Sequence, residues 1–356
     1  MDFNLTDDRQ MLADTLNRFL TEQYPVEYRV NVAYEAPFHD AALWDQMVEL
    51  GALYALAPEQ AGGMGGSGFD IAVVFEALGR RLCPEPVLGA LMASRLLAAA
   101  GADQEPLLTG ACKYAVGISE IDAAYELDQV ATVATGAGDA ITLSGRKSTV
   151  YGGQVADVIL VAAKQDDRLG VYAVQAAQAN ITGYGMMDGG GAAEVLLDNT
   201  PASLLIADAQ EALQDAINAG ILALCAEAVG VMDVTHTMTV DYLKQRKQFG
   251  IPIGKFQVLQ HRAVDMLTEI EQARSITIKA AAELGGVEAS KYASMAKNMI
   301  GRAARLIGEE SIQMHGGIAM TWEYAVSHYA KRLIMLDAQL GDTDYHLSQV
   351  MKTYVA

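Results

Sequence analysis

Residues that cross-link a protein or carry positive charge are scarce in this 356-residue chain. The three cysteines, Cys83, Cys112 and Cys225, are far apart and odd in number, so they suit neither a disulfide framework nor a zinc site. This usage indicates a reducing, cytoplasmic compartment, and no metal site is expected. The 25 Lys and Arg are outnumbered by 44 Asp and Glu, giving a formal net charge of −19. Because nucleic acids and anionic membranes attract basic surfaces, neither is an expected partner.

Long apolar runs are also missing. No run reaches about 18 residues, so a membrane-spanning helix is not expected. Residues 1–8 are acidic and polar, which does not fit a secretory signal. The chain is nevertheless 51% hydrophobic and only 19% charged, as expected of a globular protein with a sizeable core. At about 150 residues per domain, its length indicates two or three structural units.

Hydrophobic periodicity divides the chain into three segments. Residues 1–104 have a helical pattern, with a glycine-rich loop at 58–68. Residues 105–205 contain short β-type runs separated by glycines, which predict a small antiparallel barrel or sandwich. Residues 206–356 return to helix, and four long helices with short connections predict a bundle. The expected class is therefore mainly α with a central β-domain. The helices expected are at 7–20, 41–50, 70–82, 87–100, 216–245, 256–284, 290–314 and 323–340, with a short one after Gly341.

Two segments about 65 residues apart suit a phosphate-bearing ligand. Residues 242–257 place cations at a helix C-terminus before an aromatic residue and a Gly–Pro turn. The cations suit the helix dipole, but the planar fork of Arg246 also suits a phosphate. Downstream, the pair Gly316-Gly317 is typical of a helix C-cap followed by a turn. Such a pair also lets backbone N–H groups approach a ligand closely.

These segments carry a resemblance to the acyl-CoA dehydrogenase family. The pattern is Arg246-x-x-Phe249-Gly250, then Phe256-Gln257, then Gln313-x-His315-Gly316-Gly317. The loop from Pro58 to Gly63 and the run 75–80 are similar to the family's as well. The closest branch is the short one that includes the small subunit of pimeloyl-CoA dehydrogenase. The resemblance covers nearly the whole chain and implies an N-terminal helical domain, a β-barrel or sandwich, and a C-terminal four-helix bundle.

The resemblance implies an FAD site held by the β-domain and the bundle. Five residues are implied to reach the FAD of a neighbouring subunit in a dimer of dimers: Arg246, Phe249, Gln313, Gly316 and Gly317. Ser119 and Glu120 match a strand end that lies along the flavin. Thr149 and Tyr151 stand where the family has an aromatic residue and a threonine.

The usual positions of the family's catalytic glutamate hold no carboxylate here. Counting from Gly316-Gly317 places the late-loop position at Leu340, and counting back from Phe249 places the alternative at Gly220. Asp342, two residues past the vacant position, is the candidate base. Asp344 is a weaker candidate. Asp342 equally suits an N-cap of the last helix.

The implied activity is FAD-dependent α,β-dehydrogenation of an acyl-CoA thioester. A base removes the α-proton, the β-hydrogen leaves as hydride, and an electron-transferring flavoprotein receives the electrons. The expected assembly is a homotetramer, or a heterotetramer with a larger homologous subunit. Because both base positions are vacant, the alternative is a non-catalytic small subunit that completes FAD sites in a heteromeric dehydrogenase. Other flavin chemistry on the same scaffold is a weaker alternative.

Overall fold

The computed structural model describes residues 5–355 and divides into two compact units. The bundle unit takes residues up to 26, 71–83 and from 221 onward, whereas the sheet unit takes residues 27–70 and 84–220. Each unit is thus assembled from segments distant in sequence. The division into 1–104, 105–205 and 206–356 follows periodicity along the chain and stays a prediction. Half of the acidic segment 1–8, residues 1–4, lies outside the described residues.

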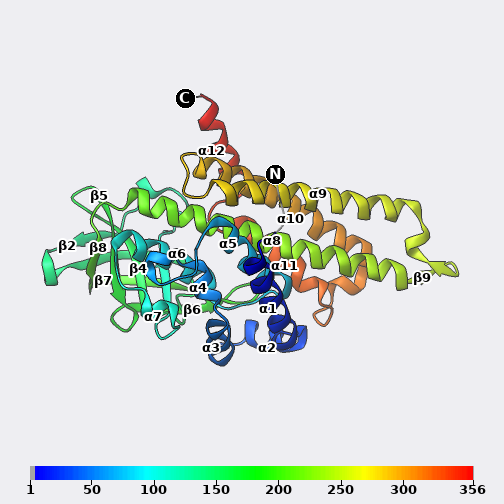
Figure 1. The fold of residues 1–356 in the computed structure, drawn as a ribbon, viewed down its shortest axis with the longest axis horizontal. Coiled ribbons are helices and arrows are strands. Elements are labelled where there is room, and N and C mark those ends of the chain that lie inside the picture. Colours follow the sequence, from blue (N-terminus) through cyan, green and yellow to red (C-terminus); the bar gives the residue numbers. More distant parts are fainter. Residues whose placement is uncertain (1–4, 356) are drawn as a thin grey trace. The chain divides into compact units, whose positions relative to one another are not determined.

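The sheet unit is built on one eight-stranded sheet (Figure 1). Its strands are β1 (Tyr114–Gly117), β2 (Val133–Thr135), β3 (Thr142–Tyr151), β4 (Val158–Gln165), β5 (Arg168–Gln175), β6 (Asn180–Gly185), β7 (Gly191–Pro201) and β8 (Ser203–Ile206). The order is β6-β7-β3-β2-β4-β5-β8, and β1 pairs with β4 outside this path.

Two pairs in this sheet are parallel, although the predicted arrangement was antiparallel throughout. Strand β4 runs parallel to β1 and β2, and the other pairs are antiparallel. Side chains alternate in the same way in both kinds of ladder, so short β-type runs do not reveal the direction of a partner. The first six residues of β4 are buried, as expected for a strand covered on both faces. The predicted class, mainly α with a central β-domain, is confirmed.

Short helices complete the sheet unit. They are α2 (Val26–Tyr34), α3 (Ala41–Glu49), α4 (Ala52–Leu56), α6 (Val87–Ala100) and α7 (Glu105–Leu108). The side chain of Asp40 caps α3 by accepting the N–H groups of Ala42 and Leu43 at 2.9 and 3.0 Å. Gly101 ends α6 in the left-handed region, as its place in the sequence predicts.

The bundle unit contains the remaining helices, and the longest of these run side by side in Figure 1. They are α1 (Asp7–Gln23), α5 (Gly68–Arg81), α8 (Gln210–Gln245), α9 (Gln257–Glu283), α10 (Ala289–His315), α11 (Val326–Ala338) and α12 (Thr343–Val355), and the first residues of α5 and α8 belong to the sheet unit. The four predicted long helices are confirmed, although the first begins at 210 rather than 216 and the fourth runs from 326 to 338 rather than from 323 to 340. A short hairpin, β9 (Lys247–Gln248) and β10 (Ile251–Pro252), joins α8 to α9.

Short 3-10 helices lie between these elements. They are η1 (Glu59–Ala61), η2 (Leu127–Gln129), η3 (Gly138–Ala140), η4 (Ala176–Gln178), η5 (Ile253–Lys255) and η6 (Gly316–Met320). The first of them lies in the predicted glycine-rich loop, which otherwise has no regular structure.

Small residues let α5 and α8 approach each other closely. A Cβ atom at Gly79 would lie 2.1 Å from the carbonyl oxygen of Glu227, and one at Gly230 would lie 2.2 Å from that of Glu76. Both distances are far inside van der Waals contact. The two glycines therefore set the spacing between these helices.

Helix α8 is long and apolar enough to cross a membrane by length and composition alone. However, 83% of its most apolar 18-residue window is buried inside the protein, as in the core helix of a folded domain. Its apolar side chains are therefore already covered by protein.

Candidate functional site

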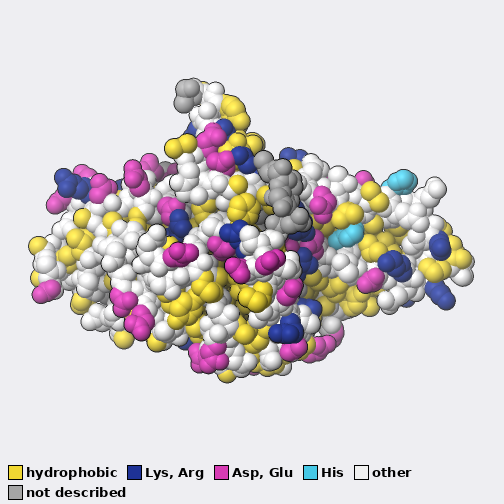
Figure 2. All heavy atoms as spheres, viewed as in Figure 1, with side chains coloured by type: hydrophobic (Ala, Val, Ile, Leu, Met, Phe, Trp, Pro, Cys, Tyr) yellow, Lys and Arg dark blue, Asp and Glu magenta, His cyan; other side chains and the backbone are white. Residues whose placement is uncertain are grey.

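Arg246 lies just past the end of α8, at the entry of the β9–β10 hairpin. Its N–H donates to the carbonyl of Tyr242 at 2.8 Å, and its carbonyl accepts the N–H of Ile253 at 2.8 Å. Its side chain is exposed. Phe249 forms the turn at φ 55° and is 91% exposed. Figure 2 shows Lys and Arg side chains gathered at this end of the bundle, in a protein whose net charge is −19.

The Gly316-Gly317 turn follows the end of α10. Gly316 has φ 69°, a conformation that favours glycine, and its N–H donates to the carbonyl of Ile312. A Cβ atom at either glycine would meet no heavy atom within 4 Å. Gln313, one turn earlier, is also exposed. The turn therefore offers side-chain-free backbone and an exposed amide with open space beside them.

An aromatic cluster that the sequence analysis did not identify connects these two segments. The rings of Tyr242, near the end of α8, and His315, at the end of α10, have centroids 4.6 Å apart. Tyr324 packs edge-on against His315 at 5.4 Å. Burial lowers the pKa of His315, although its bond to the carbonyl of Ser311 opposes this effect. The stack places the cation-rich end of α8 beside the glycine turn of α10.

Asp342 lies in the connection from α11 to α12 and is half buried. Its Oδ1 accepts the N–H of Tyr345 at 2.7 Å, so the carboxylate caps α12. Asp344 is exposed in the first turn of α12. Helix α12 begins at Thr343, so the expected late loop, 340–346, is reduced to its first three residues.

Two buried titratable residues adjoin this connection and were not predicted. The Lys297 Nζ atom lies 2.7 Å from the carbonyl oxygen of Gly341, and the His346 Nε2 atom lies 2.9 Å from that of Leu340. Burial lowers the pKa of Lys297 to about 8 and that of His346 to about 4. Lys297 is 44 residues from Gly341 in sequence, so no local pattern identifies it, whereas His346 lies only four residues past Asp342.

In the sheet unit, the predicted cofactor-binding residues lie on backbone segments that are hydrogen-bonded to each other. The carbonyl of Ser119, just past β1, accepts the N–H of Ser148 in β3 at 2.9 Å. Thr149 follows at φ 54°, and its N–H donates to Glu194 at 3.3 Å. Tyr151 ends β3. Ser119, Thr149 and Tyr151 are all half buried, so each keeps some exposed surface.

The side chain of Glu120 is buried and does not contribute to the partly exposed surface to which Ser119 belongs. It pairs with the fully buried Lys147 at 2.7 Å and accepts the backbone N–H of Thr132 at 3.0 Å. Burial alone would raise the pKa of Glu120, but these bonds outweigh it and lower the pKa. Burial lowers the pKa of Lys147 to about 8 against the pull of Glu120. The Glu120–Lys147 ion pair therefore links the segment after β1 to β3 and has a structural role.

Glu227 of α8 does not replace the carboxylate that is missing at Gly220. Gly220 is buried in that helix. Two turns later, Glu227 accepts two bonds from Arg332, at 2.6 and 2.7 Å, and both side chains are largely buried. Because both carboxylate oxygens accept bonds from the same guanidinium, Glu227 is a structural link between α8 and α11.

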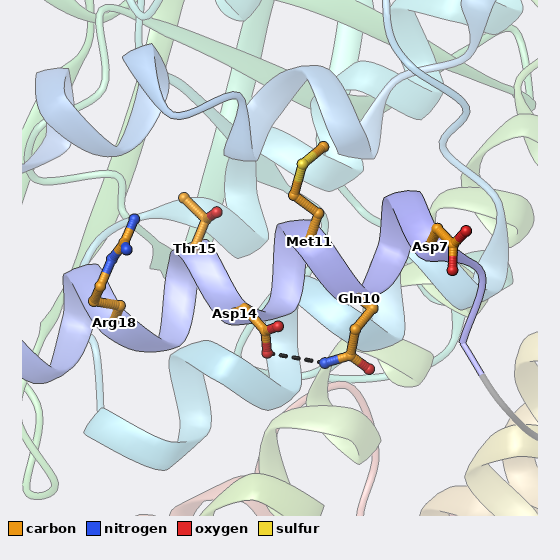
Figure 3. A pocket seen from close by; sticks show the side chains of 6 residues that line it. All are labelled: Asp7, Gln10, Met11, Asp14, Thr15 and Arg18. Carbon is orange, nitrogen blue, oxygen red and sulfur yellow. Dashed lines mark hydrogen bonds between the residues drawn. The ribbon is translucent and has the colours of Figure 1, made fainter.

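A pocket on α1 contains none of the predicted site residues. A pocket of about 340 Å³ is lined by one face of α1, where Gln10 bonds Asp14 at 2.9 Å (Figure 3). All six of its lining residues come from that single helix. Within residues 5–355, no group of three or more His, Cys, Asp or Glu is placed to hold a metal ion.

Comparison with known proteins gives two family models that together span most of the chain. The acyl-CoA dehydrogenase N-terminal domain matches residues 6–105, and the acyl-CoA dehydrogenase C-terminal domain matches residues 211–355. Acyl-CoA dehydrogenase IpdE2 of Mycobacterium tuberculosis is 31% identical over 332 residues, covering 92% of this chain and 91% of that protein.

Solved structures share the fold. A variant of the Tcur3481-Tcur3483 steroid ACAD superposes with a TM-score of 0.90 at 26% identity, covering 98% of both chains. The ChsE4-ChsE5 complex from Mycobacterium tuberculosis superposes with a TM-score of 0.91 at 22% identity, covering 100% of this chain and 99% of that one.

Proposed function

Because this chain belongs to the acyl-CoA dehydrogenase family, we propose that it takes part in FAD-dependent α,β-dehydrogenation of an acyl-CoA thioester. In this proposal an electron-transferring flavoprotein receives the electrons. The observation that carries the proposal is the open Gly316-Gly317 turn, joined through Tyr242 and His315 to the helix end that bears Arg246.

The donor set suits an FAD pyrophosphate. Arg246 supplies an exposed guanidinium and Gln313 an exposed amide, and the glycine turn lets a ligand approach the backbone without side chains in the way. Phe249, exposed beside them, offers a flat apolar surface. In the sheet unit, Ser119, Thr149 and Tyr151 would meet the ring system. When bound, FAD would supply the acceptor for the β-hydrogen.

Asp342 is the base of this proposal. Its carboxylate would take the α-proton of the thioester, a step that a positioned base typically accelerates by a factor of about 10² to 10⁴. The position two residues past the family's usual one is fixed by the start of α12, because the same carboxylate caps that helix.

A second candidate function is supported by the vacant positions. Leu340 and Gly220 carry no carboxylate, and Glu227 is committed to Arg332. A small subunit that completes FAD sites on a larger, catalytic homologue would need Arg246 and Gly316-Gly317 but no base. The Tcur3481-Tcur3483 and ChsE4-ChsE5 proteins are each named as pairs of chains. The proposed assembly is accordingly a homotetramer or a heterotetramer.

A cytoplasmic location is also part of the proposal. The free thiols of Cys112 and Cys225 suit a reducing compartment.

A visible spectrum of the purified chain, followed by anaerobic addition of acyl-CoAs of different chain types, tests the proposal. A flavin band that one thioester bleaches would support a self-sufficient dehydrogenase. Bound flavin that bleaches only after a larger homologous chain is added would support the small-subunit function. Absence of flavin and of acyl-CoA binding, with and without that partner, would contradict both.

A further inference from the structure

The connection between α11 and α12 is held from three sides. Helix α11 ends at Ala338 and α12 begins at Thr343, so the connection consists of residues 339–342. The last carbonyls of a helix have no partners within it. Lys297 of α10 supplies one, because its ammonium donates to the carbonyl of Asp337 at 2.8 Å and to that of Gly341 at 2.7 Å. A cation at this end also suits the helix dipole.

His346 of α12 holds the next carbonyl. Its Nε2 lies 2.9 Å from the carbonyl oxygen of Leu340, and its Nδ1 lies 3.1 Å from the hydroxyl of Ser294. Because a carbonyl can only accept, Nε2 carries a proton, and because burial lowers the pKa of His346 to about 4 the ring carries no second one, so Nδ1 accepts from Ser294. The imidazole is therefore neutral and oriented at both nitrogens.

The third contact joins the two helices across the connection. Asp337 Oδ1 accepts the backbone N–H of Thr343 at 3.1 Å and its hydroxyl at 2.7 Å. Gly301 of α10 makes room for this pair, since a Cβ there would lie 2.2 Å from both oxygens. At Gly341, a Cβ would lie 2.4 Å from His346 Nε2. The surroundings thus leave no space for a larger residue at either position.

These contacts maintain a strained backbone at Leu340. Its φ of 54° lies in the left-handed region, which is unfavourable for a residue with a Cβ atom. Such conformations persist where the surroundings over-determine them. The surrounding contacts therefore hold the backbone of residues 340–341 in one conformation, although Leu340 carries a Cβ atom.

We propose that Lys297 is a positioning residue that fixes the backbone of residues 340–342, and with it the carboxylate of Asp342, for proton removal. The inference rests on the proposed function. Lys297 acts through main-chain carbonyls and touches neither substrate nor cofactor. A lysine that merely filled the core would not need to bridge a carbonyl at the end of α11 and one in the connection, and a methionine would fill the same volume without donating.

Amide hydrogen exchange tests the positioning role without requiring any activity. The variants are Lys297→Gln, which keeps a neutral donor, and Lys297→Met, which removes donation. Exchange at the amides of Thr343 and Tyr345 is expected to rise in the order native, Gln, Met, reaching at least tenfold in Met. Arg305→Met, an exposed cation on the same helix, is the matched control and should leave these amides unchanged. Unchanged exchange in Lys297→Gln and in Lys297→Met overturns the proposal, and if the latter does not fold, Lys297→Gln decides.

The second readout is the rate of flavin reduction per bound flavin, measured in the complete assembly with a partner chain where one is needed. Lys297→Met is expected to keep its flavin but to lose about 10- to 100-fold in that rate, with Lys297→Gln between. A purely structural role would lower flavin content and leave the rate per flavin unchanged, which overturns the proposal. If native protein shows no flavin reduction in any assembly, the proposed function fails, and hydrogen exchange still decides the role of Lys297.

Discussion

In the proposed function, the carboxylate of Asp342 both caps α12 and removes the α-proton. A single substitution separates these two roles. Asparagine caps helices about as well as aspartate but cannot take a proton. Asp342→Asn is therefore expected to keep the thermal midpoint of the native protein and to abolish bleaching of the flavin by acyl-CoA. Asp344→Asn, in the exposed first turn of α12, should change neither. Full turnover in Asp342→Asn would move the base to another residue or to a partner chain.

Arg246 is expected to contribute to flavin retention through charge. A hydrogen bond to a charged group is worth about 1.5–3 kcal/mol, so Arg246→Ala should weaken FAD binding by about 10- to 100-fold. Flavin content after gel filtration measures this. Arg305→Ala removes an equally exposed cation from α10 and is expected to retain flavin. Equal flavin content in the two variants would remove the pyrophosphate assignment.

The low pKa of His346 predicts that the folded protein loses stability in mild acid. Burial lowers its pKa from 6.5 to about 4 in the folded protein, and Lys297 adds to that shift while Asp337 and Asp342 oppose it. Below about pH 6.5 the unfolded chain gains a proton on this residue that the folded chain does not take up until near pH 4. Stability is therefore lost as the pH falls through that window, by about 3 kcal/mol in total.

Denaturant midpoints at pH 7 and pH 5 check this effect. His346→Gln, which keeps an N–H donor for the carbonyl of Leu340, is expected to lose less stability between the two pH values than the native protein. His261→Gln, at an exposed position of α9, should behave as native. An identical loss in native protein and His346→Gln would contradict the assignment.

At the scale of elements, the spacing of α5 and α8 depends on glycine. A Cβ at residue 230 would lie 2.2 Å from the carbonyl oxygen of Glu76, so Gly230→Ala forces the helices apart. Overpacking of this kind costs about 1–3 kcal/mol. Chemical denaturation should show that loss. Gly308→Ala is the matched control, because a Cβ there meets its nearest atom at 3.8 Å and favours helix; its stability should not fall.

The elements also show how far local pattern extends. Long amphipathic helices were predictable because their periodicity repeats over many turns, and their ends agree within a few residues. The short helices α2, α4 and α7 were not predicted, whereas α3, which is as short as α2, was predicted because its apolar residues share one face and Gly51 follows it. The start of α12 at Thr343 was set by caps on both sides of the connection, and so the late loop is shorter than expected.

At the scale of the whole molecule, the bundle unit presents an apolar groove that a homologous chain would cover in the proposed assembly. The groove has a volume of about 730 Å³ and is lined by residues of α9 and by Met299 of α10. Val264 and Leu267 are 59% and 44% exposed there. Exposed apolar patches of this kind are typical of subunit contacts.

Leu267→Asp places a charge in that groove and is expected to shift the assembly to a smaller mass by light scattering. Val287→Asp, at a fully exposed position of the turn between α9 and α10, should leave the mass unchanged. If Leu267→Asp keeps the native mass, the groove is not part of the subunit contact.

The sequence by itself determined the class of fold, the long helices and the two motifs that bear Arg246 and Gly316-Gly317, because each is written in a short stretch of chain. The tertiary structure alone decided the parallel pairing of β4, the stack of Tyr242 on His315, and the burial of Lys297 beside Gly341. These depend on contacts between residues dozens of positions apart. A local pattern does not specify such contacts, since the energy of a buried cation or a packed ring is set by the neighbours that folding supplies.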